Sequence, residues 1–213
     1  MMPVSDSAPE SPLFAESPVI VCRDPLAEFL GVGDGTLHYR FDDVVRLSGH
    51  ACPTVAGAFL LVKRAFAELY DDGEVPERGG LRITVYGPAH EGVNGPISQV
   101  FTLLTGAAAD NGFHGIAGSF ARDGLLRFAA PDEGSSGTFT FERHSNGRRV
   151  TLAFDSSPVL GSSRFRQGAQ GLVGVRNGLR PSEERPHFSA LWREGVELLL
   201  ADAGVRTVQV VHH

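Results

Sequence analysis

One long apolar stripe constrains the fold of this 213-residue chain more than any other feature. Its members follow Cys52-Pro53 at spacings that alternate between four and three: Val55, Phe59, Val62, Phe66 and Leu69. Such spacing places all five side chains on one face of an α-helix of about five turns. The turn residues Asp71, Asp72 and Gly73 then end the helix.

The rest of the pattern predicts strands and further helices around this long helix. Alternating apolar residues and turn signals predict strands at Leu81–Tyr86, 113–120, 125–129, 138–142, 150–154 and 205–211. Helices are expected after Asp24-Pro25, from about Asn94 to Gly106 and over 189–203. This order predicts an α+β fold, with the long and second helices packed on one face of a mixed, mostly antiparallel sheet.

The composition along the chain predicts three parts. Residues 1–17, rich in Ser, Pro and Glu, are expected to be a disordered tail. Residues 18–155 form the predicted core. Residues 156–213 are expected to add a C-terminal helix and strand, after a long Gly- and Arg-rich loop over 156–186. The arginines of segment 164–180 either lie on a solvated linker or close over an anionic ligand.

Charge and cysteine content exclude several classes of protein. The net charge of −6 is unfavourable for a broad nucleic-acid surface. Two cysteines, Cys22 and Cys52, cannot form a disulfide framework, and they favour a reducing compartment. The first residues lack the pattern of a secretory signal, and no apolar run approaches the ~20 residues of a membrane span. We therefore expect a cytoplasmic protein.

The segment before the long helix carries the strongest chemical signal. His50 and Cys52 are two residues apart, so an extended backbone directs both side chains to one side. The helix dipole at the N-cap favours a thiolate at Cys52. Thiolate and imidazole together suit a zinc-type metal site or a nucleophile–base pair. The alternative is a small residue at a helix start beside a hydrogen-bonded His.

Three segments resemble one known family. The stretch GHACPTVAGAFL, residues 49–60, resembles the GHxCPG segment of the formylmethanofuran dehydrogenase FmdE family. PISQVFTLLTG, residues 96–106, is similar to that family's second helix, and GFHG, residues 112–115, to its glycine-rich turn. The resemblance implies a metal-binding α+β core and a homodimer. No cysteine follows Cys52, so the Cys-rich zinc finger of many members is missing.

The resemblance also implies a ligand set. The family's second-helix cysteines are missing, and the turn that carries His114 is expected near the start of the long helix. His50, Cys52 and His114 would then hold one divalent metal, expected to be zinc, and leave a fourth position open. Three protein ligands with an open position are typical of catalytic zinc.

Three functions follow as hypotheses. The first is a metal-dependent enzyme acting on a small anionic molecule, with His90 or Glu91, in the loop after Leu81–Tyr86, as the catalytic base. His90 could instead be a fourth ligand that Glu91 orients. The second is a non-catalytic metal- or cofactor-binding accessory protein. The third is a purely structural metal site.

Overall fold

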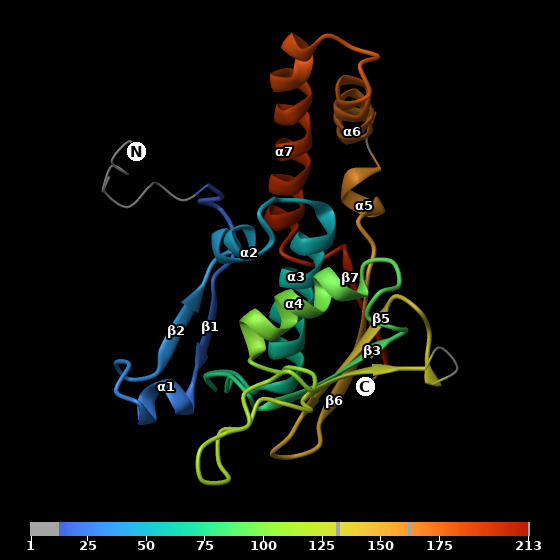
Figure 1. The fold of residues 1–213 in the computed structure, drawn as a ribbon. Helices are drawn as coiled ribbons and strands as arrows, with labels where there is room; N and C mark the ends of the chain where they lie inside the picture. Colours follow the sequence, from blue (N-terminus) through green and yellow to red (C-terminus); the bar gives the residue numbers. More distant parts are fainter. Residues whose placement is uncertain (1–12, 131–132, 162, 213) are drawn as a thin grey trace.

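The computed structural model describes residues 13–130, 133–161 and 163–212 (Figure 1). Its elements, in chain order, are β1 (Ile20–Arg23), α1 (Pro25–Phe29), β2 (Thr36–Tyr39), α2 (Phe41–Ser48), α3 (Pro53–Leu69), β3 (Leu81–Tyr86), α4 (Asn94–Thr105), β4 (Leu126–Ala129), β5 (Thr138–Arg143), β6 (Arg149–Phe154), α5 (Ser157–Leu160), α6 (Ser163–Arg176), the 3-10 turn η2 (Ser182–Glu184), α7 (Arg185–Asp202) and β7 (Val208–His212). Among these residues, no helix is both long and apolar enough to cross a membrane.

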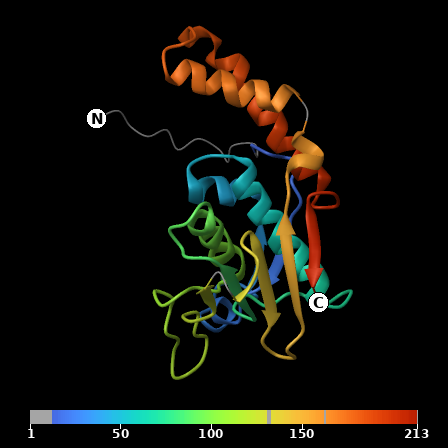
Figure 2. The ribbon, with the colours of Figure 1, turned by 90° about the vertical axis from the view of Figure 1, so that its right-hand side faces the viewer.

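A five-stranded sheet in the order β4-β3-β5-β6-β7 forms one layer of the core. β3 pairs with β4 in parallel, whereas the other neighbours are antiparallel. Leu81, Ile83 and Val85 of β3 are buried in alternation with more exposed residues, so one face of the sheet is apolar. Helices α3 and α4 cover that face (Figure 2). The predicted α+β fold is confirmed.

The long helix α3 forms as the apolar stripe predicts. Cys52 is its extended N-cap residue and Pro53 occupies its first turn, where a missing N–H costs nothing. All five stripe residues are buried. On the sheet side, a Cβ at Gly57 would overlap the Phe154 ring, so only glycine lets the helix approach β6 this closely. Helix α4 likewise ends at Gly106, which adopts a left-handed conformation.

One predicted hairpin is confirmed and one is wrong. β5 and β6 pair around residues 145–147 as expected. Residues 113–120, in contrast, form no strand but part of a loop over 106–125, which folds back on itself through Ala108 N to Arg122 O (2.9 Å) and Arg122 N to Phe113 O (2.7 Å). After the turn at Asp123-Gly124, the chain continues as β4, which pairs in parallel with β3.

The loop predicted over 156–186 is also wrong. These residues form α5, α6, η2 and the start of α7, and α6 and α7 pack as a helical hairpin that projects from the core (Figure 1). Glycines lower helix propensity, which is why the segment resembles a loop. Here they allow close packing instead, since a Cβ at Gly171 would overlap the Phe188 ring. Tertiary packing outweighs local propensity in α6.

The described part of the predicted tail is ordered against the core. Phe14 is buried, and its ring meets Phe41 edge-on with centroids 5.0 Å apart. The Asp42 carboxylate accepts hydrogen bonds from the backbone N–H groups of Leu13 (2.9 Å) and Phe14 (3.2 Å). A disordered tail is thus wrong for residues 13–17, and the rest of that prediction lies outside the described residues.

Candidate functional site

His50 and Cys52 lie in the short connection between α2 and α3. Gly49, with φ of 72°, ends α2, and the exposed His50 ring places Nδ1 2.9 Å from the Ser48 carbonyl oxygen. Cys52 is half-buried against the core. Trp192 of α7 donates its indole N–H to the Ala51 carbonyl at 2.8 Å, which fixes the backbone between the two residues.

His114 does not join them in a metal centre. Its side chain is 79% exposed, and its Nδ1 lies 3.0 Å from the Asp123 carboxylate. Within the described ranges, no three His, Cys, Asp or Glu side chains are placed to hold one metal ion. His50, Cys52 and His114 therefore form no such group within a single chain, and the zinc centre stays a prediction. His90 and Glu91 are exposed in the loop between β3 and α4.

All three predicted segments nevertheless border one cavity of about 640 Å³ beside α4, which we call the α4 cavity. Leu47 lies three residues before His50, Ala89 directly before His90, and Phe113 directly before His114; all three line it. The full lining comprises Leu47, Arg78, Ala89, Gly95, Ser98, Gln99, Thr102, Leu103, Gly106, Ala108, Ala109, Asn111, Gly112, Phe113, Arg122, Leu126 and Phe128. The sequence motifs thus lie next to this cavity, but the predicted side chains of His50, Cys52, His90, Glu91 and His114 do not themselves line it.

Two arginines that line this cavity share one buried carboxylate. Asp24 Oδ2 accepts from Arg78 Nη1 at 2.8 Å, and Asp24 Oδ1 accepts from Arg122 Nη2 at 2.7 Å. Asp24 also caps α1, as predicted, by accepting from the N–H groups of Leu26 (2.9 Å) and Ala27 (3.3 Å). We call Asp24, Arg78 and Arg122 the arginine cluster. It ties β1, the end of α4 and the 106–125 loop together.

Glycines make room for this cluster. Gly79, with φ of 88°, would place a Cβ on top of Arg122 Nη1, so any side chain there would displace the guanidinium. Gly106 also faces the cluster, because its Cβ would meet Arg78 Cγ at 3.1 Å. Arg122 Nη1 donates to the Arg78 carbonyl. Its buried Nε has no partner within the part of the chain that the structure describes.

Burial and charge oppose each other within the cluster. Burial raises the pKa of Asp24, but the hydrogen bond from Arg78 and the charge of Arg122 outweigh it, and the net pKa is lowered. Burial lowers the pKa of Arg122, and the charge of Asp24 opposes that change. Nearby Cys22 is fully buried, as predicted, and burial raises the pKa of its thiol to about 11. Asp24 is therefore a carboxylate and Cys22 an inert thiol.

Sequence reasoning missed the arginine cluster because its members are far apart in the chain. Asp24 is 54 positions from Arg78 and 98 from Arg122. The local signal at Asp24 is that of a helix cap, and Arg78-Gly79-Gly80 has the composition of a turn. No short motif connects them, and only the fold brings them together.

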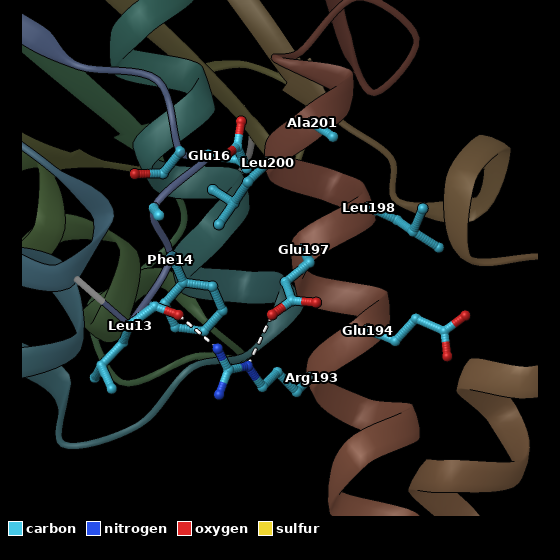
Figure 3. A pocket seen from close by; sticks show the side chains of 11 residues that line it. Leu13, Phe14, Glu16, Arg193, Glu194, Glu197, Leu198, Leu200 and Ala201 are labelled. Atoms are coloured by element: carbon cyan, nitrogen blue, oxygen red, sulfur yellow. Dashed lines mark hydrogen bonds and ion pairs between the residues drawn. The ribbon is translucent and has the colours of Figure 1, made fainter. Parts of the chain in front are cut away.

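A second cavity, of about 450 Å³, lies between residues 13–17 and α7 (Figure 3). Its arginine, Arg193, donates to the Leu13 carbonyl and to Glu197, both at 2.7 Å. Glu16 and Glu194 also line it, so acidic side chains outnumber its one arginine. This second cavity contains no residue that the sequence motifs indicated.

No family model matches the chain, and neither does any curated protein or solved structure.

Proposed function

We propose that the protein binds a small anionic molecule in the α4 cavity. One observation carries this proposal: the cavity is lined by two arginines and, among the described residues, by no acidic side chain. Asp110 and Asp123 are next in sequence to lining residues, yet neither lines the cavity. The charged side chains that an anion would contact in the cavity are therefore both positive, and together they exceed the single negative charge of Asp24 behind them.

The size and remaining lining support a small organic ligand. A cavity of about 640 Å³ is within the usual ~300–1,000 Å³ of ligand sites. Gln99 and Asn111 carry amide groups that can donate to an anion, whereas the Ser98 and Thr102 hydroxyls already donate to the Gly95 and Ala107 carbonyls. The rest of the wall is apolar, which strengthens electrostatic attraction relative to open water.

The two arginines contribute differently. The Arg122 side chain is 9% exposed and held by Asp24 and the Arg78 carbonyl, so it supplies a fixed positive field. The Arg78 side chain is 22% exposed and can contact a ligand directly. We propose binding only; an acid–base role for His90 or Glu91, near Ala89, stays a prediction.

Thermal unfolding in increasing acetate or phosphate, at constant ionic strength, tests the proposal. A ligand at 100 times its Kd stabilises a protein by about 2.7 kcal/mol, which is about 5–10 °C in Tm for a chain of this size. We expect saturable stabilisation that Arg78→Gln abolishes. Arg82→Gln, which removes an equal charge from an exposed residue of β3, should leave it intact.

If Arg78→Gln fails to fold, a second pair of variants still tests the proposal. Gln99 is exposed on α4 and lines the cavity, so Gln99→Glu adds a repelling charge without disturbing the core. Gln170→Glu adds the same charge on exposed α6. Anion stabilisation that is equal in Gln99→Glu and Gln170→Glu would contradict the proposal.

The zinc hypothesis is tested separately. Elemental analysis of the purified protein and of Cys52→Ser decides it: one zinc per chain that is lost in the variant would support metal binding by Cys52. Because the described residues of one chain offer no three-ligand group, such a result would require ligands from elsewhere, for example from the partner in the predicted homodimer. Anion binding at Arg78 needs no metal.

A further inference from the structure

We infer that the ligand of the α4 cavity is a monocarboxylate with an apolar body about the size of an aromatic ring. This inference rests on the proposed function and deepens it by naming the ligand class. Three features of the cavity support it: its charge, the donors of Arg78 and its apolar wall.

The first feature is a surplus of one positive charge. The arginine cluster holds two guanidinium groups and one carboxylate, and Asp24 is only 5% exposed. The carbonyl groups at the end of α4 offset a fraction of one charge. Glu77, another acid near Arg122, is exposed and lines a neighbouring cavity. A monoanion balances the surplus, whereas a dianion would leave a negative charge against apolar walls.

The second feature is a set of poorly used donors on Arg78. Its bond to Asp24 is 2.8 Å long, but Nε and Nη2 reach the Thr102 and Leu103 carbonyls only at 3.2–3.4 Å. Typical N–H···O distances are about 2.9 Å. A ligand carboxylate would give this edge of the guanidinium shorter, charge-assisted and bidentate bonds. Arg78 is therefore the residue that recognises the head group.

The third feature is the wall beyond the arginines. Five large apolar side chains belong to it: Leu47, Leu103, Phe113, Leu126 and Phe128. Alanines and glycines of the 106–112 segment leave space between them. Among the neutral polar lining residues, Ser98 and Thr102 already donate their hydroxyl protons to backbone carbonyls, so Gln99 and Asn111 would have to pair with the many hydroxyl groups of a sugar or nucleotide. The wall therefore favours a hydrocarbon or aromatic body.

Four probes that vary the charge, the head group and the apolar body test the inference by calorimetric titration. They are 3-phenylpropionate, its neutral amide, acetate and phenyl phosphate. We expect 3-phenylpropionate to bind tightest. Its Kd should be about 10- to 100-fold lower than that of the amide, because the neutral amide cannot form the charge-assisted hydrogen bonds to Arg78. Phe113→Ala changes a half-exposed side chain and should raise Kd by about 3- to 10-fold.

The outcomes separate this inference from the proposed function. Tighter binding of phenyl phosphate or acetate that disappears in Arg78→Gln would overturn the ligand class but leave an anion site. If the amide binds as tightly as 3-phenylpropionate, the inferred ligand class is also overturned. If no probe binds, or if binding is the same in Arg78→Gln and Arg82→Gln, both the inference and the proposed function fail.

Discussion

The arginine cluster and the α6–α7 hairpin use the same chemistry in opposite settings. Both contain arginine–carboxylate pairs with short distances, such as Arg122–Asp24 at 2.7 Å and Arg164–Glu194 at 2.9 Å. In the first pair the side chains are 9% and 5% exposed, and in the second 67% and 41%. Similar distances therefore do not mean similar energies.

Burial determines what each pair contributes. Water solvates both partners of the exposed pair, so its formation gains little. Within the cluster, each charge depends on its partner, because an isolated buried charge is very unfavourable. The hairpin is instead held by apolar and glycine contacts between α6 and α7. The comparison predicts that charge changes disrupt the cluster, whereas volume changes disrupt the hairpin.

The largest effect is expected at Asp24. Asp24→Asn leaves the buried Arg122 guanidinium and the partly buried Arg78 guanidinium without a counter-charge, and the loss of one partner of a buried ion pair costs about 3–5 kcal/mol. Urea unfolding of the wild type and the variant measures the difference. Glu194→Gln is the matched control from the hairpin and should change the free energy of unfolding by less than about 1 kcal/mol. Equal effects would contradict the comparison.

The same residue should produce a pH dependence. The folded-state pKa of Asp24 is lowered, so its stabilisation is present above the unfolded pKa and is lost as pH falls through the folded pKa. Glu74 acts in the same direction, because its hydrogen bonds with Arg143 lower its pKa to about 2. The stability of Asp24→Asn, measured from pH 6 to pH 3, should therefore fall less steeply than that of the wild type. Parallel curves would show that Asp24 carries no such linkage.

In the hairpin, the sensitive position is Gly171. Gly171→Ala places a Cβ against the buried Phe188 ring, and overpacking of this kind costs about 1–3 kcal/mol despite the better helix propensity of alanine. At Gly174, the nearest atoms belong to the flexible Arg180 side chain, at 3.1 Å and beyond. Gly174→Ala should therefore be neutral or stabilising by up to about 1 kcal/mol. Thermal unfolding of both variants distinguishes the two positions, and equal stability of the two would contradict close packing at Gly171.

The smallest effect is expected for Arg164→Gln. This change removes the other half of the exposed Arg164–Glu194 pair, so the cost should again lie below about 1 kcal/mol. Repeating the measurement in high salt sharpens the result, because salt screens exposed pairs more than buried ones. If the free energy of unfolding falls by more than about 2 kcal/mol, the exposed ion pairs of the hairpin contribute substantially to stability, which would contradict the comparison.

What could be predicted from sequence was encoded locally. The α3 stripe, Cys52 at its N-cap and the β5–β6 hairpin each depend on residues close in the chain, and all are confirmed. The helix α6 could not be predicted, because Gly171 is favourable only when Phe188 packs opposite it. The arginine cluster could not be predicted for the same reason, because its residues meet only in the folded chain. The motifs at His50, His90 and His114 lie beside the α4 cavity, but the arginines that line it come from other segments.

The most direct test of an anion site at Arg78 is a crystal structure of the protein soaked in iodide, located by its anomalous signal. We expect an iodide peak beside Arg78 in the α4 cavity of the wild type, and its absence in Arg78→Gln. Peaks only at exposed arginines of the α6–α7 hairpin, with none in the cavity, would contradict an anion site there.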